Sequence, residues 1–294
     1  MKLGAFEVNE PLPELNEPHV LAMLQPWVDV GNVGSLVLSW METHFEAKEL
    51  AKLVRPGDFF DFTRYRPTIY RKGRQRQVAI PNTYITYAKQ KTGNDFLFLH
   101  LLEPHSQSEI YVDSMIQLLT KFNTKRYCLI GSMYDYVPHT KPLLVTGKAE
   151  EKKTQQSLEK MGITSSDYQG PTTIISLLMQ QAPKMKMETM SLIVHLPQYT
   201  QLDDDFMGAV RLMKVLGSLY ELPEDKAYLE KAEQQLEQIN LALEKNPQLK
   251  TTIEQLETRY ERRAKRRKEE EETSQLSPEI ESFLNEMERR FQEN

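Results

Sequence analysis

Four residues with charged or proton-exchanging side chains stand near the ends of predicted strands: Asp29, Arg66, Glu103 and His139. Ligands of open α/β sheets bind beyond the carboxyl ends of the strands, so we expect these side chains to line a crevice there. Arg66 would hold an anion, while Glu103 and His139 could exchange protons. One hypothesis is therefore an enzyme or small-ligand binder that uses this crevice.

Three residues of this region also have a structural interpretation. His139 lies between two prolines in the loop 136–142, and with no nucleophile nearby in sequence we favour a hydrogen-bond strut for this loop. Glu103 could pair with Arg66 or Lys141 across the crevice, or cap the helix that follows it. Gly31 opens a Gly-Asn-Val-Gly segment whose amides could face an anion, although a tight turn is favoured.

Other motifs of reactive proteins are missing from the sequence. It contains no Walker phosphate loop, GxGxxG, GxSxG or HExxH pattern, so we expect no nucleotide cofactor and no catalytic metal. Cys128 is the single cysteine, which excludes an internal disulfide, and it is expected to be a buried small hydrophobe. The acidic run 203–205 precedes a predicted helix and is expected to cap it rather than bind magnesium.

The elements that must position these residues alternate between strands and helices. Short apolar runs predict strands at 19–24, 59–63, 66–70, 96–102, 126–131 and 191–196, and the segments 76–79 and 84–87 are expected to pair antiparallel. Helical spacing predicts helices from residue 33 onward and at 110–122, 152–161, 172–181 and 205–219. Buried strands interleaved with helices indicate a three-layer α/β/α domain over residues 1–222, with a mixed, mostly parallel sheet.

Charge divides the chain into two unlike parts. Residues 1–223 carry 24 Lys/Arg and 24 Asp/Glu, whereas residues 224–294 carry 13 and 18, which is the whole net charge of −5. This balance argues against nucleic acid as a partner. The basic run 262–268 is followed by four glutamates at i,i+4 spacing, so a solvated helix is favoured over a nucleic-acid patch.

The longest apolar run, 96–102, is far shorter than the ~20 residues that a bilayer requires, and no leader opens the chain, so we expect a cytoplasmic protein.

Residues 223–294 are predicted to form a helical hairpin followed by a terminal amphipathic helix. Leu236 and Ile239 lie on one apolar seam, and Leu256 lies on the seam that resumes after Pro247. Phe283 and Met287 belong to the apolar face of the last helix. Such seams need a partner, which is the body of the chain, a second copy or a client protein.

Six segments, taken in order, carry a resemblance to a known family: Trp-Val-Asp-Val-Gly at 27–31, Asp-Phe-Thr-Arg-Tyr-Arg-Pro at 61–67, Glu-Pro at 103–104, Pro-His-Thr-Lys-Pro at 138–142, Gly-Pro at 170–171 and Pro-Gln-Tyr at 197–199. Over residues 18–222 the chain resembles the proteasome assembly chaperones of the second-chaperone type, which include bacterial and archaeal members. Lys141 and Gln198 depart from the arginine and histidine of the family pattern.

The resemblance implies an α/β/α domain similar to nucleoside phosphorylases but without their catalytic residues. It also implies a non-enzymatic role in assembling a protein complex, and a homo-oligomeric or paired state. A proteasome-like complex is then a candidate partner, although the chain ends Phe-Gln-Glu-Asn, without the penultimate tyrosine by which some archaeal relatives dock on proteasome rings. We therefore expect an interaction protein rather than an enzyme, acting through the seams around Leu236 and Ile239.

Overall fold

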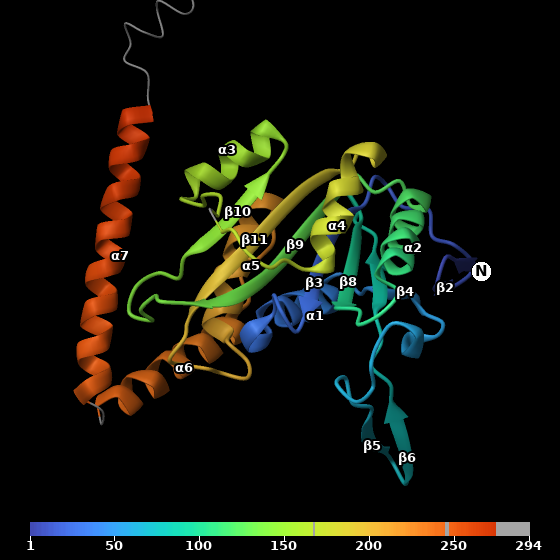
Figure 1. Cartoon of the computed structure of the whole chain (residues 1–294), viewed down its shortest axis with the longest axis horizontal. Helices are drawn as coiled ribbons and strands as arrows, with labels where there is room; N and C mark the ends of the chain where they lie inside the picture. The colour runs from blue at the N-terminus through green and yellow to red at the C-terminus, as the bar shows by residue number, and fades with distance from the viewer. Residues whose placement is uncertain (167, 245–246, 275–294) are drawn as a thin grey trace, which may run out of the picture. The chain divides into compact units, whose positions relative to one another are not determined.

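A large mixed sheet forms the centre of the protein (Figure 1). The computed structural model describes residues 1–166, 168–244 and 247–274. Within them, nine strands form the main sheet in the order β1-β2-β4-β7-β8-β3-β9-β11-β10. Their bounds are β1 (Lys2–Leu3), β2 (Phe6–Val8), β3 (His19–Gln25), β4 (Lys48–Leu53), β7 (Tyr84–Ala88), β8 (Phe96–Leu102), β9 (Arg126–Asp135), β10 (Val145–Ala149) and β11 (Glu188–Pro197).

Parallel pairing is confined to the middle of this sheet. The neighbouring strands β8, β3, β9 and β11 run parallel, and the strands on either side of them pair antiparallel. The carboxyl ends of the four parallel strands therefore meet at one edge, where ligands of such sheets bind. The predicted α/β class with a mixed sheet is confirmed, but the expectation of a mostly parallel sheet is wrong. Of the strand pairings in the main sheet of the described residues, three are parallel and five are antiparallel, because the outer strands are added as antiparallel neighbours of the central group.

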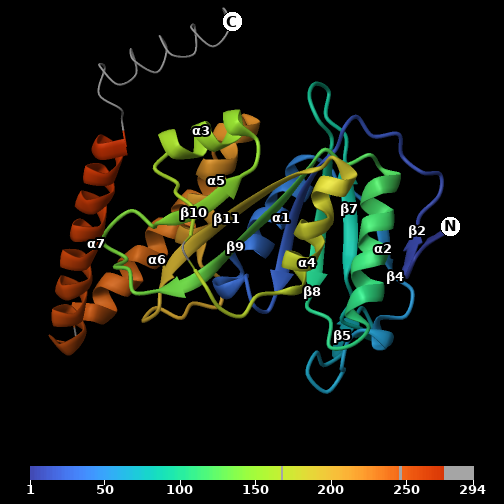
Figure 2. The same cartoon turned by 45° about the horizontal axis from the view of Figure 1, so that its top comes forward.

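Helices cover both faces of the sheet (Figures 1 and 2). The helices of the described residues are α1 (Val33–His44), α2 (Ser108–Lys121), α3 (Lys152–Lys160), α4 (Ile174–Gln181), α5 (Phe206–Tyr220), α6 (Lys226–Glu244) and α7 (Pro247–Ser274), with short 3-10 turns η1 (Val30–Asn32), η2 (Pro56–Asp58) and η3 (Ala182–Met185). The apolar residues of α2 and α4 share one core, and those of α1, α3 and α5 share the other. The three-layer arrangement follows from these two cores.

The central strand β3 shows why both faces are covered. Val20, Ala22 and Leu24 belong to one core, and Leu21 and Met23 belong to the other. Successive side chains of a strand point to opposite faces, so a continuous apolar strand requires cover on both sides.

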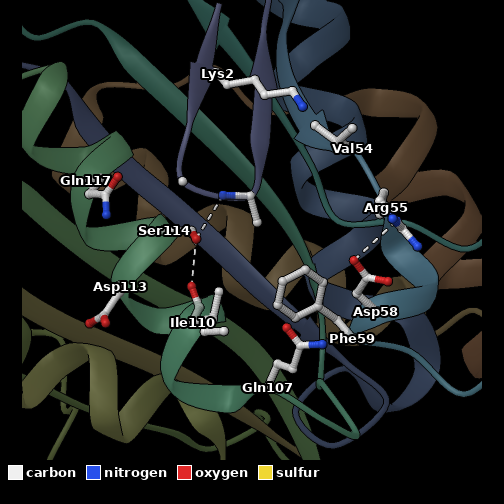
Figure 3. A pocket seen from close by; sticks show the side chains of 12 residues that line it. Lys2, Val54, Arg55, Asp58, Phe59, Gln107, Ile110, Asp113, Ser114 and Gln117 are labelled. Atoms are coloured by element: carbon white, nitrogen blue, oxygen red, sulfur yellow. Dashed lines mark hydrogen bonds and ion pairs between the residues drawn. The ribbon is translucent and has the colours of Figure 1, made fainter.

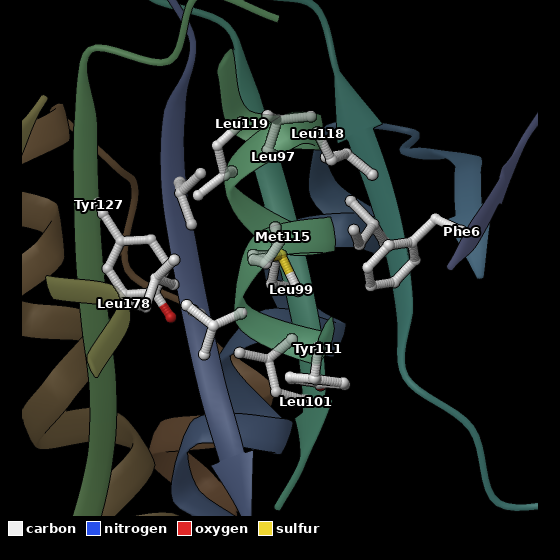
Figure 4. Close-up of a cluster of buried hydrophobic side chains, with 14 of the residues drawn as sticks. Phe6, Leu97, Leu99, Leu101, Tyr111, Met115, Leu118, Leu119, Tyr127 and Leu178 are labelled. Atoms are coloured by element: carbon white, nitrogen blue, oxygen red, sulfur yellow. The ribbon is translucent and has the colours of Figure 1, made fainter. Parts of the chain in front are cut away.

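The apolar run of β8 divides in the same way. Leu97, Leu99 and Leu101 face the core that α2 contributes to, while Phe96 and Phe98 face the other core. Figure 4 shows the first group packed beside the apolar side chains of α2. The prediction of a strand buried on both faces at 96–102 is confirmed.

The prediction of a strand at 59–63 is wrong. Pro56 begins the turn η2, and Phe59 and Phe60 are consecutive residues that are both buried in the same core. A strand would send them to opposite faces, so the chain turns here instead.

The predicted pairing of 76–79 with 84–87 is also wrong. The strand β6 (Gln75–Ala79) pairs with β5 (Thr68–Lys72) in a separate hairpin, whereas β7 pairs with β4 and β8. Pro81 has no N–H for a ladder, and the Asn82 side chain donates to the Leu53 carbonyl, which carries the chain from the hairpin back to the main sheet. The strands β1, β2, β4 and β10 were not predicted.

The chain divides into two units, residues 1–240 and residues 241–294. In the first unit, α6 carries Ala232, which is buried, and Leu236 and Ile239, which are half-buried. In the second, α7 carries Leu256, which is buried. Phe283 and Met287 lie outside the described residues. Among the described residues, no helix is both long and apolar enough to cross a membrane.

Candidate functional site

A cavity of about 960 Å³ lies at the carboxyl ends of β3 and β8. We call it the strand-end cavity. Its walls come from the residues that follow these two strands and from the turn after η2, and they include Trp27, Asp61, Arg64, Tyr65, Glu103 and His105. Three of the segments that carry the family resemblance, at 27–31, 61–67 and 103–104, thus meet at one cavity.

Glu103 is the member of the predicted crevice set that lines this cavity. Its carboxylate Oε1 accepts the Ile174 backbone N–H at 2.9 Å, while its Oε2 is buried with no hydrogen-bond partner. Burial raises the pKa of this carboxyl group, and the bond from Ile174 opposes the shift. Glu103 therefore caps α4, whose own preceding residue provides no side-chain cap, rather than the helix that follows it in sequence.

Aromatic rings and an acid form another part of the cavity wall. The Tyr65 hydroxyl donates to the Glu103 carbonyl oxygen at 3.1 Å, and its ring lies 4.7 Å from the His105 ring. His105 Nδ1 accepts the Asp61 backbone N–H at 3.2 Å. Hydrogen bonds from the backbone and hydroxyl of Thr63 lower the pKa of Asp61. These bonds tie the wall to the end of β8, and the Tyr65 ring gives it an aromatic surface beside the acid.

Asp29 lies in a different place and closes the start of α1. Its Oδ1 accepts the Gly34 N–H at 2.6 Å and the Ser35 N–H at 3.2 Å, and its Oδ2 accepts the Ser35 hydroxyl at 2.6 Å and the Gln25 amide at 3.3 Å. Burial raises its pKa, and these bonds oppose the rise. The anion at this helix N-terminus is thus the protein's own carboxylate. Gly31 has a φ of 60°, which explains a glycine in the turn before the helix.

His139 is tied to two other elements. Its Nδ1 lies 2.6 Å from the Tyr199 hydroxyl and its Nε2 lies 3.0 Å from Asn240 Oδ1 of α6. Its backbone N–H also donates to the Tyr199 hydroxyl at 2.8 Å. The segments 138–142 and 197–199 of the resemblance therefore meet each other here, and this geometry matches a strut. Lys141 is half-buried on the same loop, and Arg66 is exposed beside the hairpin β5–β6.

The structure also contains a buried His-Asp pair that was not predicted from the sequence. His195 Nδ1 lies 2.8 Å from Asp135 Oδ2, and its Nε2 lies 2.9 Å from Thr146 Oγ1. The connectivity is that of a catalytic triad, but Thr146 and His195 are each only 5% exposed, so a substrate carbonyl has no room to approach. The network links β9, β10 and β11. A polar residue within the predicted strand 191–196 was the signal that could have found it.

A second cavity, of about 400 Å³, lies between the turn of β1–β2, the turn η2 and α2 (Figure 3). The Ser114 hydroxyl accepts the Ala5 backbone N–H at 3.0 Å and donates to the Ile110 carbonyl at 2.6 Å. Gly4 has a φ of 56°, and a Cβ there would lie 2.5 Å from Ser114 Oγ. These contacts fasten the N-terminal strands to α2 beside the cavity.

Two expectations about single residues are confirmed at other positions. Asp205 Oδ1 accepts the Gly208 N–H at 2.7 Å and so caps α5. Cys128 is buried, and burial raises the pKa of its thiol to about 12, which keeps it protonated and unreactive.

The fold and these loops define an α/β/α protein whose polar residues at the strand ends are bound into the scaffold. The sequence profile of the PAC2 family matches residues 23–243, so the chain belongs to the PAC2 family. The resemblance seen in the six sequence segments is thereby confirmed. No curated protein matches the chain.

Solved structures share this fold at low sequence identity. A Corynebacterium glutamicum protein of unknown function is 18% identical with a TM-score of 0.78, over 89% of this chain and 99% of that one. A Mycobacterium tuberculosis proteasome-assembly chaperone homologue is 17% identical with a TM-score of 0.68, over 80% and 99%. Pyrococcus furiosus PbaB, an archaeal proteasome activator, is 17% identical with a TM-score of 0.63, over 83% and 100%.

Proposed function

We propose that this chain is a non-enzymatic, assembly-chaperone-like protein of the cytoplasm, which binds other polypeptides and copies of itself. One observation carries the proposal: the polar side chains at the strand ends are engaged in holding helices and loops. Asp29 caps α1, Glu103 caps α4, and His139 joins α6 to the loop after β9. Groups that serve such bonds are poorly placed to act on a substrate.

The relatives of this fold support the same direction. One is a proteasome-assembly chaperone homologue and another is a proteasome activator, so a proteasome-related complex is the candidate partner. The binding element that we propose is the seam of α6 at Leu236 and Ile239, which stay half-buried on a helix fixed to the body by Tyr228 and Gln235. A helix with an apolar seam can associate with another helix or a groove without any reactive group.

The test replaces both seam residues in the full chain. Leu236→Asp with Ile239→Asp should lower the oligomer mass in light scattering or abolish partner capture from the native host. Gln238→Asp, on the exposed side of the same helix, is the matched control and should change neither. An unaltered mass and unaltered capture in a folded double variant would show that the seam serves internal packing alone.

The strand-end cavity favours a second candidate function, the binding of a small ligand or peptide side chain. Its volume of about 960 Å³ and its aromatic wall support this alternative. A thermal-shift screen with nucleosides, phosphates and short peptides tests it, with Tyr65→Ala as the variant that removes one wall. A ligand that raises the melting temperature of the wild type but not of Tyr65→Ala would support binding here, and no shift with any compound would reject it.

A further inference from the structure

The β5–β6 hairpin presents a face that nothing in the described part of the chain covers. It extends away from the main sheet (Figure 1). Ile69 is paired with Val78, and Arg71 is paired with Arg76, so these four side chains share one face. Ile69 is 66% exposed and Val78 is 58% exposed. The face therefore combines an apolar pair near the base with an arginine pair near the tip.

The charge of this region is entirely positive. Residues 62–94 contain eight Lys/Arg and no Asp/Glu. The arginines at 71 and 76 stand directly opposite each other, an arrangement that destabilises a strand pair. An isolated two-stranded hairpin is itself only marginally stable in water. An acidic surface placed over this face would relieve the repulsion.

Such a surface exists on α6 of the same chain. Ala227, Glu230, Glu233 and Glu237 are exposed and recur at intervals of three and four residues, so they form one stripe, which carries one exposed cation, Lys226, at its first turn. We call it the acidic stripe. Like charges at these spacings repel each other on a helix. The stripe lies on the side of α6 away from Leu236 and Ile239, so it is separate from the apolar seam.

We propose that the β5–β6 hairpin of one copy docks on the acidic stripe of a second copy. Arg71 and Arg76 would pair with Glu230 and Glu233, since guanidinium groups bind carboxylates with two parallel hydrogen bonds. The apolar pair lies about 7 Å along the strand from the arginine pair. Ala227 lies about 5 Å along the helix before Glu230 and is small enough to accept Ile69 and Val78 beside it.

A second copy fits better than the other occupants. In both views the hairpin and α6 lie at different ends of the body, so one chain does not bring the two together (Figures 1 and 2). Nucleic acid would use the arginines but not the apolar pair, and the chain carries a net charge of −5. Because each copy has both surfaces, the contact is head-to-tail, and it closes into a ring or extends into a chain. The inference rests on the self-association in the proposed function and assigns it a specific surface.

Charge reversal and charge exchange test this pairing. Sedimentation velocity of the full chain should show a concentration-dependent oligomer that weakens at high salt. Arg71→Glu with Arg76→Glu should weaken its association roughly tenfold or more, as should Glu230→Arg with Glu233→Arg. Mixing the two reversed variants should restore association between them. Lys89→Glu with Lys91→Glu makes the same charge change at exposed positions outside the hairpin and should have no such effect.

Each contrary outcome overturns the proposal. A wild type that stays monomeric at all concentrations would do so, and so would reversed variants that associate as before. If both variants lose association and the mixture does not regain it, the hairpin and the acidic stripe do not pair with each other. Arg71→Gln with Arg76→Gln, checked by circular dichroism, separates lost charge from lost folding. If Leu236→Asp with Ile239→Asp dissociates the oligomer while the arginine variants do not, the proposed function stands and this pairing fails.

Discussion

The loops at the strand ends and the β5–β6 hairpin differ in whether their charged and polar side chains have partners within the chain. In the loops, Asp29 receives several donors and His139 has both ring nitrogens occupied. In the hairpin, Arg71 and Arg76 face each other in an exposed, acid-free stretch. In the first region Asp29 and His139 find their partners within the chain, whereas the partner that we propose for Arg71 and Arg76 lies outside it.

This difference points to where the protein acts. Removing one partner from a buried hydrogen-bonded group leaves the other unsatisfied and costs free energy of unfolding. Removing one of two repelling surface charges should not lower the free energy of unfolding, because it removes an electrostatic repulsion. Residues of the first kind maintain the fold, whereas a pair of the second kind lowers the stability of its own hairpin, a cost that binding surfaces often carry. The contrast therefore favours an interaction protein over an enzyme.

Asp29→Ala should give the largest effect of the variants that test this comparison. It removes the acceptor of the Gly34 and Ser35 donors at the start of α1 and leaves those donors buried or half-buried. We expect the free energy of unfolding to fall by about 2 to 4 kcal/mol. Urea denaturation followed by circular dichroism measures it.

The conservative variant Asp29→Asn keeps one acceptor oxygen and should recover part of that loss. If Asp29→Ala unfolds at the same urea concentration as the wild type, the carboxylate is not holding α1. The strand-end loops would then no longer differ from the hairpin in the way described, and a catalytic role for Asp29 would regain weight.

The sequence predicted the centre of the fold well, because apolar strands buried on both faces leave an unmistakable pattern. The runs in β3 and β8 are of this kind. The strand β4, with the sequence Lys-Glu-Leu-Ala-Lys-Leu, carries no such signal, since charged residues and alanine do not favour strands. The turn at Phe59 and Phe60 misled the prediction because aromatic pairs favour strands locally, while the tertiary core buried both rings together.

The candidate site was predictable only as a location. Strand order along the chain placed Asp29, Glu103 and His139 at strand ends, and that is where they lie. Which of them share a cavity depends on the spatial order of the strands and on partners distant in sequence. Glu103 meets Ile174, and His139 meets Asn240, contacts that no local spacing encodes.

Glu103→Gln should have the next largest effect, smaller than that of Asp29→Ala because the glutamine oxygen still accepts the Ile174 N–H and only the charge is removed. Burial raises the pKa of Glu103 above its usual value of 4.5, so between those two pKa values the native state binds more protons than the unfolded state. The free energy of unfolding therefore falls as the pH rises through this window and stays lower above it. The variant should lack this fall and be more stable than the wild type at neutral pH.

Urea denaturation at a series of pH values from 4.5 upward checks the Glu103 prediction. Glutamine keeps an acceptor for the Ile174 N–H, whereas Glu103→Ala removes it and should be less stable than Glu103→Gln. Identical pH profiles for Glu103→Gln and the wild type would mean that burial does not disfavour the Glu103 carboxylate in this cavity, and the prediction would be wrong.

Arg71→Thr should give the smallest effect, with the opposite sign to Asp29→Ala. It removes one of two opposed charges and places a strand-favouring residue in β5, so the hairpin should gain a few tenths of a kcal/mol. Hydrogen exchange of the β5–β6 amides, at protein concentrations too low for association, reports this local change better than global unfolding.

Lys72→Thr, opposite Gln75 on the other face, is the matched control. If Lys72→Thr slows exchange as much as Arg71→Thr, repulsion between the arginines is not the cause. If the hairpin amides exchange more slowly while self-association weakens, the arginines stabilise the contact between copies and not the strand pair that carries them.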